Sequence, residues 1–136
     1  MRKVLFLLCV ISVLIGCRKA PGNEPKKIVA DIALPITLEP FEVHDEWLPN
    51  GDGLLIHRYH LDATLYEDIE KQLNKAKASK LPFAVNLDVD NKIFDFIDDN
   101  DQGLYLITYD PEDDGGSTLV VLNYSKMELT VLMSYI

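Results

Sequence analysis

The stretch "STLVVLNYSKMELTVLMSY", residues 117–135, decides the fold. In its second half, Leu129 and Val131 lie two positions apart and share one face, which is the period of a β-strand. The first half contains a run of aliphatic residues of a length typical of a β-strand. The break "NYSK" between them is short, and a short connection joins antiparallel neighbours. We therefore expect a hairpin whose strands are residues 118–124 and 127–135.

Upstream of this hairpin, residues 104–109 predict a third strand, joined to it by "DPEDDGGS". The clearest helical pattern precedes that strand, in residues 62–80, where Thr64 and Glu67 predict a capping box. Its apolar face is predicted to consist of Leu65, Ile69, Leu73 and Ala76. The expected fold class is therefore α+β: an antiparallel β-sheet with one main helix packed on a face.

The N-terminal half of the chain predicts further extended segments. Alternating apolar residues predict a strand at 32–38, which Pro35 would place at a sheet edge or over the core as an extended arm. Residues 41–53 predict a polar loop that contains the turn "NGDG" and the single tryptophan, Trp47. Residues 54–61 then predict another strand.

The segment before the predicted third strand is harder to assign. The alternation in "FAVNLDVD", residues 83–90, favours a strand or an extended segment. The next segment, residues 91–99, has two interpretations. With Asp90 as N-cap it is a short helix that points Ile93 inward, and with a turn at its start residues 92–97 form a strand. We favour the helix.

A different signal stands at the start of the chain. Three residues with two positive charges precede an apolar run at 4–15, which ends in Leu14-Ile15-Gly16-Cys17. This arrangement resembles the signal of bacterial lipoproteins, and the resemblance implies cleavage after Gly16 and lipid on the Cys17 thiol. By the same resemblance, Arg18 in place of an aspartate favours the outer over the inner membrane of a Gram-negative envelope. The alternatives are an ordinary secretory peptide or an N-terminal anchor helix.

The cysteine count agrees with a lipid anchor. Cys9 lies in the predicted signal peptide, so a mature chain has no thiol besides Cys17, which excludes an intrachain disulfide, a catalytic cysteine and a zinc–thiolate site. No cofactor is expected other than the covalent lipid. The expected organisation is a signal peptide at 1–16, the lipidated cysteine and a flexible tether at 17–27, and a single globular domain at 28–136.

The charge is strongly acidic, with 22 Asp and Glu against 13 Lys and Arg and a net charge of −9. Removal of residues 1–16 takes two positive charges away and leaves −11. Such a domain repels nucleic acid and anionic headgroups, and it favours cations or a basic protein partner.

The acidic turn sequence has a second interpretation. Asp110, Glu112 and Asp114 stand at positions one, three and five of a calcium loop, with Gly115 at position six. Position twelve is Val121 where that loop has a bidentate glutamate. A weak calcium site and a solvated hairpin tip are both compatible with this sequence, and we favour the tip.

The remaining candidate residues lie close to the tryptophan. His44, next to Asp45, Glu46 and Trp47, could serve in metal or acid–base chemistry, or belong to an exposed polar loop. His57 and His60 lie three apart on a predicted strand, so they face opposite sides. The sequence contains no HExxH, P-loop or GxSxG motif. The candidate partner-binding residues are Trp47, Asp113 and Asp114.

The order of parts gives one further resemblance. The segment "WLPNGDGLLIHRYHL", the following helix, "LP" and "GLYLITYD" with the last hairpin resemble small bacterial lipoproteins and secreted proteins of no assigned activity, over residues 47–135. We expect a membrane-anchored envelope lipoprotein that is not an enzyme and that binds a basic partner, as immunity or inhibitor proteins do. The alternative is a weak calcium-binding protein or a carboxylate-dependent enzyme.

Overall fold

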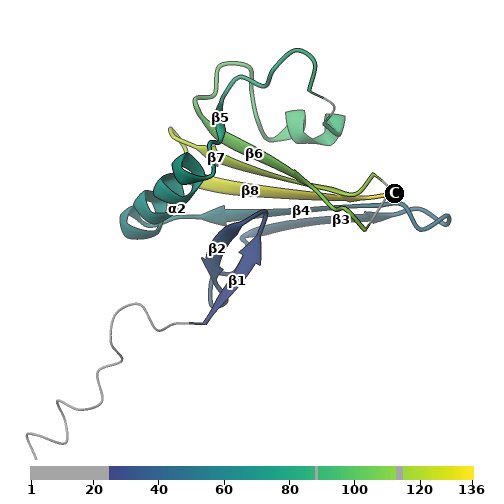
Figure 1. The fold of residues 1–136 in the computed structure, drawn as a ribbon, viewed down its shortest axis with the longest axis horizontal. Coiled ribbons are helices and arrows are strands. Elements are labelled where there is room, and N and C mark those ends of the chain that lie inside the picture. The colour runs from purple at the N-terminus through teal and green to yellow at the C-terminus, as the bar shows by residue number, and fades with distance from the viewer. Residues whose placement is uncertain (1–24, 88, 113–114) are drawn as a thin grey trace, which may run out of the picture.

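The structure is a computed structural model that describes residues 25–87, 89–112 and 115–136. These residues form a six-stranded and a two-stranded sheet, both antiparallel, and one α-helix (Figure 1). The predicted α+β class is confirmed. No helix in the described ranges is long and apolar enough to cross a membrane. The predicted signal peptide and Cys17 lie outside the described residues.

The small sheet pairs β1 (Lys26–Val29) with β2 (Ile32–Pro35), so the first strand among the described residues begins at Lys26, inside the segment predicted as a tether. The large sheet has the order β3-β4-β8-β7-β6-β5. Its strands are β3 (Glu42–Trp47), β4 (Gly53–His60), β5 (Ser79–Lys80), β6 (Gly103–Tyr109), β7 (Ser117–Asn123) and β8 (Glu128–Tyr135). The helices are α2 (Ala63–Lys75) and the short 3-10 helix η1 (Asn91–Asp95).

Both faces of the large sheet are covered, because its central strands are apolar on both sides. Figure 1 shows the β1–β2 hairpin on one side of the sheet and η1 on the other. The first core lies under α2 and the hairpin and contains, among others, Tyr59, Val120, Leu122, Leu129 and Val131. The second core lies under residues 81–97 and contains, among others, Ile56, Leu119, Val121 and Leu132. The helix on one face was predicted, and the cover of the other face was not.

The helix is shorter than predicted and has a different cap. The side chain of Asp62 accepts a hydrogen bond from the amide of Leu65 over 2.8 Å, so the predicted Thr64–Glu67 capping box is wrong. Aspartate one residue before the first turn is a stronger N-cap than threonine inside it. The helix ends near Lys75 because Lys77 has a φ of +59°, which turns the chain so that residues 79–80 can pair with β6.

The prediction of a polar loop at 41–53 is also wrong for residues 42–47. Residues 42–47 form β3, which pairs along its whole length with β4. The cause is long-range, because pairing with an available strand satisfies the backbone of a polar segment as well as that of an apolar one. The predicted turn is confirmed, with Gly51 at a φ of +97°.

The two segments before β6 have opposite outcomes. The described residues 83–87 and 89–90 do not form a strand, and the amide of Leu87 donates to the carbonyl of Ala84 over 3.0 Å in a turn. The short helix at the following segment is confirmed as η1. The Asp90 side chain caps it by accepting from the amide of Lys92 over 2.9 Å, and Ile93 is fully buried.

Candidate functional site

Two turns that are far apart in the sequence lie at the same end of the large sheet. The antiparallel register aligns the ends of five strands across the sheet, so the β3–β4 turn and the β6–β7 turn are neighbours on either side of the end of β8 (Figure 1). We call this end, opposite α2, the distal end. The residues aligned there are Trp47 with Gly53, Gly53 with Tyr135, Ser134 with Ser117, and Ser117 with Tyr109.

Trp47 lies on one face of the distal end. Its ring covers Gly53, where a Cβ atom would come within 2.5 Å of the tryptophan ring. It also stacks on Tyr135, with ring centroids 5.3 Å apart and planes 24° apart. Despite these contacts Trp47 is 57% exposed, and the adjacent Leu48 is 61% exposed. An aromatic pair held in place but open to solvent is typical of a binding surface.

An open cleft of about 600 Å³ lies on the other face of the distal end. Among the residues that the structure describes, its charged lining consists of Glu46, Asp52, Asp90 and Lys92. The amine of Lys92 lies 3.2 Å from a carboxylate oxygen of Asp95, so its charge is already paired. The three carboxylates therefore set the sign of the cleft, which favours a cation. We call it the acidic cleft.

The lining of the acidic cleft also includes two serine hydroxyl groups and several apolar side chains. The hydroxyl oxygens of Ser117 and Ser134 are 2.9 Å apart across β7 and β8. Leu48, Leu54 and Ile136 add apolar surface. Such a site can receive a lysine or arginine side chain, because the aliphatic stem packs on the apolar residues while the charged head reaches the carboxylates.

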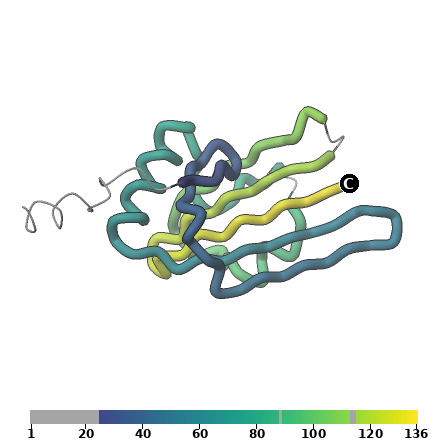
Figure 2. The backbone as a smooth tube through the Cα atoms, turned by 90° about the horizontal axis from the view of Figure 1, so that it is seen from below, coloured from purple at the N-terminus to yellow at the C-terminus, as the bar shows by residue number. Residues whose placement is uncertain are grey.

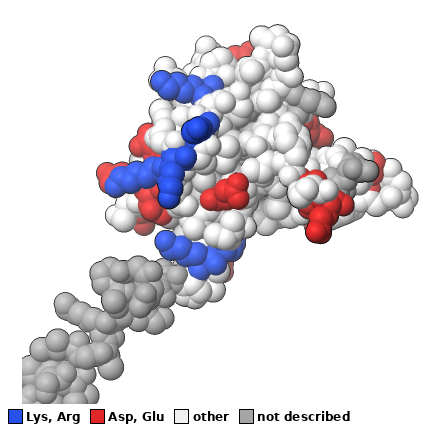
Figure 3. Space-filling model, viewed as in Figure 1, with Lys and Arg blue, Asp and Glu red and all other residues white. Residues whose placement is uncertain are grey.

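The β6–β7 turn adds acidity beside the cleft. The carboxylate of Asp110 accepts a hydrogen bond from the amide of Glu112 over 2.9 Å, as in an ordinary Asx turn. Asp113 and Asp114, two of the candidate partner-binding residues, lie outside the described residues. On the face drawn in Figure 3, the distal end carries acidic side chains, whereas basic side chains gather toward the helix and the β1–β2 hairpin.

The candidate calcium ligands in the sequence, at the turn for which a solvated hairpin tip is the favoured interpretation, are Asp110, Glu112 and Asp114, and the last of these is not described. Within residues 25–87, 89–112 and 115–136, no three His, Cys, Asp or Glu side chains are grouped closely enough to hold a metal ion. The carboxylate of Asp110 is oriented toward the backbone of its own turn.

The structure separates the histidines from one another. His44 lies in β3 rather than in a loop, and its Nε2 atom is 2.7 Å from Oε1 of Glu46. His60 is the last residue of β4, and its ring stacks on Phe41, just before β3, at a centroid distance of 3.7 Å. Neither ring lines the acidic cleft.

His57 is part of a small polar group on the opposite face. Its Nδ1 atom is 3.1 Å from the hydroxyl oxygen of the buried Tyr59, which also accepts a hydrogen bond from Lys27 over 3.3 Å. Burial and the charge of Lys27 lower the pKa of His57, against the opposing effect of Asp45. A neutral imidazole that accepts the tyrosine proton is consistent with this direction.

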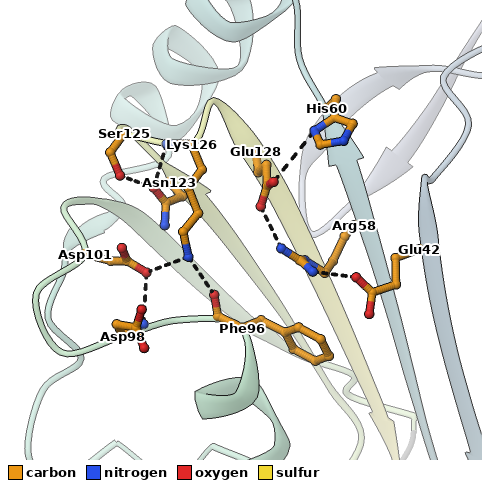
Figure 4. A network of polar contacts seen from close by, with 10 residues as sticks. All are labelled: Glu42, Arg58, His60, Phe96, Asp98, Asp101, Asn123, Ser125, Lys126 and Glu128. Atoms are coloured by element: carbon orange, nitrogen blue, oxygen red, sulfur yellow. Dashed lines mark hydrogen bonds and ion pairs between the residues drawn. The ribbon is translucent and has the colours of Figure 1, made fainter.

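A polar network that the sequence analysis missed joins β3 to the centre of the sheet (Figure 4). The guanidinium of Arg58 donates to Glu42 on β3 and, over 2.8 Å, to Glu128 on β8. It also lies 5.0 Å from the ring centroids of both Phe41 and Phe96. No local pattern marks Arg58, since its partners come from three other segments. The network anchors β3 at its first residue, Glu42.

The second half of this network leads to a pH prediction (Figure 4). Burial alone would raise the pKa of Asp101, but the hydrogen bond from the Asp98 amide, the nearby side chain of Asn123 and the charge of Lys126 lower it. The stabilisation is therefore present above the pKa of the unfolded state, near 3.8, and is lost as the pH falls through the lower folded value.

We expect Asp101→Asn to unfold at lower urea concentration than the wild type at pH 7, with a difference that shrinks between pH 4 and pH 2. Urea titrations at pH 7, 4 and 2.5 measure this. Asp99→Asn, at an exposed neighbouring carboxylate, controls for the loss of one charge. A difference between wild type and Asp101→Asn that stays constant over this range would contradict the prediction.

Comparison with known proteins gives no relative for this chain. No protein-family model matches it, and no curated protein and no solved structure shows a significant match.

Proposed function

We propose that this protein is a lipid-anchored, non-enzymatic binding protein of a bacterial cell envelope, and that its distal end binds a basic protein partner. The proposed binding of a basic partner rests on one observation. The β3–β4 turn and the β6–β7 turn, which are distant in the sequence, converge on a cleft with three carboxylates and one lysine that is already paired with Asp95.

The two faces of the distal end offer complementary contacts to such a partner. The acidic cleft accepts a lysine or arginine side chain, and the exposed Trp47–Tyr135 pair supplies aromatic area on the opposite face. Arginine and lysine also bind over aromatic rings. The net charge of −9 would steer a basic partner toward the domain and make the association rate depend on ionic strength.

The anchor is supported by the Leu14-Ile15-Gly16-Cys17 motif and by the position at which the chain enters the domain. Strand β1 begins at Lys26, on the half of the molecule away from the distal end (Figures 1 and 2). A short tether from Cys17 to Lys26 would hold the domain near the membrane, with the distal end directed away from the anchor. Two or three acyl chains suffice for stable attachment.

The binding proposal predicts a salt-sensitive interaction that depends on the cleft. The intact chain, immobilised from neutral detergent, is expected to capture a basic protein from envelope and secreted fractions at low salt and to release it at high salt. The double variant Glu46→Gln/Asp52→Asn should lower the association rate for that protein about tenfold, chiefly through lost steering. Surface plasmon resonance over a salt series measures the rate.

The matched control is Glu39→Gln/Glu67→Gln, which removes the same number of charges from exposed positions outside the cleft. Asp113→Asn/Asp114→Asn tests the turn beside the cleft in the same assay. Equal rates for the cleft variant and the control would overturn the assignment of the cleft. Capture of an acidic or neutral protein would overturn the proposed partner class.

The anchor is tested separately. In the expressing bacterium, the wild-type chain is expected in the membrane fraction, with the mass of residues 17–136 plus acyl chains. Cys17→Ser should leave the membrane fraction or retain an uncleaved signal peptide, because the thiol is the acceptor of the diacylglyceryl group. Cys9→Ser, inside the predicted signal peptide, is the control. A Cys17→Ser protein that is processed and membrane-bound like the wild type would contradict lipidation.

A further inference from the structure

Strand β3 is an edge of the large sheet. In the strand order β3-β4-β8-β7-β6-β5, it has a neighbour only on the β4 side among the residues that the structure describes. Figure 2 shows β3 along the margin of the sheet, with β4 between it and the rest of the domain. An edge strand presents a row of backbone donors and acceptors on which another extended chain can pair.

The register identifies which backbone groups point outward. The amide of Leu48 donates to the carbonyl of Asp52 over 2.8 Å, at the position where the β3–β4 register continues into the turn. Residues bonded to one neighbour alternate with residues directed to the other side. Counting back along the strand, Glu42, His44 and Glu46 bond to β4. The outward groups therefore belong to Val43, Asp45 and Trp47.

The side chains of β3 make this edge accessible and acidic. Val43 is 54% exposed and Trp47 is 57% exposed, and Asp45 between them is exposed as well. Strand β3 contains no proline or glycine, the residues that commonly block pairing at an edge. The next residue on its other face, Glu46, lines the acidic cleft. The edge and the cleft are thus continuous.

The negative charge of β3 favours a basic segment over a second copy of the chain at this edge. A second copy of the chain, pairing through its own β3, would bring Asp45 and Glu46 close to the same carboxylates of its partner, and like charges across a strand pair are destabilising. An extended segment with lysine or arginine at alternate positions would instead place these side chains on one face, over Asp45 and Trp47, and a further basic residue on its other face would reach Glu46.

We propose that β3 is the docking edge for an extended basic segment of the partner, which adds as a seventh strand to the large sheet. The segment pairs with the outward amides and carbonyls of Val43, Asp45 and Trp47, and a basic side chain at its end enters the acidic cleft beside Glu46. The inference rests on the proposed function, in that the partner is a basic protein, and it names the part of the partner that binds.

The test uses the intact chain in neutral detergent and, as a probe, the capped hexapeptide Lys-Val-Lys-Val-Lys-Lys, whose last lysine lies on the opposite face from the other three. Amide hydrogen exchange resolved by residue is the readout. On peptide binding, the amides of Val43, Asp45 and Trp47 should exchange at least about tenfold more slowly, while those of His44 and Glu46, already bonded to β4, should change little. Protection without this alternation, or no protection at all, would overturn docking on the edge.

Two variants at one position separate the backbone from the charge. Asp45→Pro and Asp45→Asn both remove the carboxylate, but only proline removes the outward donor, and an edge strand tolerates proline whose nitrogen faces solvent. The peptide should bind Asp45→Pro about tenfold more weakly than Asp45→Asn, the effect of about one hydrogen bond.

The remaining outcomes separate the two proposals. Equal affinity for the two Asp45 variants, with binding still weakened by Glu46→Gln/Asp52→Asn, would overturn docking on β3 while the acidic cleft remains the binding site. A dimer of the intact chain in analytical ultracentrifugation, with the same three amides protected in the absence of peptide, would assign the edge to a second copy and overturn the basic partner segment.

Discussion

Gly103→Ala is expected to lower the free energy of unfolding by about 3 kcal/mol. Gly103 is the first residue of β6, between β5 and β7, and it is paired with Asn123. A Cβ atom there would lie 1.8 Å from the carbonyl oxygen of Leu122 and 2.9 Å from its carbonyl carbon. Both are backbone atoms, so no side-chain rotation relieves the overlap, and β6 and β7 must separate locally.

The substitution should also destabilise residues 81–97, the segment that covers the second face of the sheet. The carbonyl of Gly103 accepts from the amide of Leu81 over 3.0 Å, which fixes the start of that segment. Urea unfolding followed by circular dichroism measures the loss. Gly51→Ala is the control, since a Cβ atom at Gly51 meets nothing within 4 Å and only its φ of +97° is strained, at about 1 kcal/mol. Equal losses in the two variants would contradict the steric explanation.

Arg58→Ala is the second substitution with a large expected effect, about 3 kcal/mol. The Arg58 side chain is 16% exposed and that of its partner Glu128 is 14% exposed, so removal of the guanidinium leaves a carboxylate in a largely dry site. The variant also loses the cation–π contacts with Phe41 and Phe96, each at 5.0 Å. The loss should appear as a lower urea midpoint and as faster amide exchange in β3.

A compensating variant distinguishes a buried charge from lost packing. Arg58→Met fills the space between the two aromatic rings, and Glu128→Gln removes the stranded charge. The double variant Arg58→Met/Glu128→Gln should therefore recover at least half of the stability lost in Arg58→Ala. Arg58→Lys keeps the positive charge but lacks the forked guanidinium that reaches both Glu42 and Glu128. Its stability should lie between that of the wild type and that of Arg58→Ala. A double variant no more stable than Arg58→Ala would contradict a cost that arises from the unpaired carboxylate.

These two residues show why the sequence alone did not predict the contacts that stabilise the fold. A glycine at a strand start has no local signature of close backbone approach, and the partners of Arg58 come from β3, β8 and the segment after η1. The acidic turn at 110–116 and the exposed position of Trp47 could be predicted, because turn chemistry and single aromatic residues are visible in a short window. That they lie at one end of one sheet could not.

The sequence by itself determined the α+β class, the strands at 104–109, 118–124 and 127–135, the turn at Gly51 and the short helix after Asp90. Each depends on periodicity or on backbone preferences of neighbouring residues. Only the tertiary structure decided that residues 42–47 form an edge strand and that the two acidic turns share a cleft. The physical reason is that strand pairing and burial depend on which distant segment is available as a neighbour, and this information is not local.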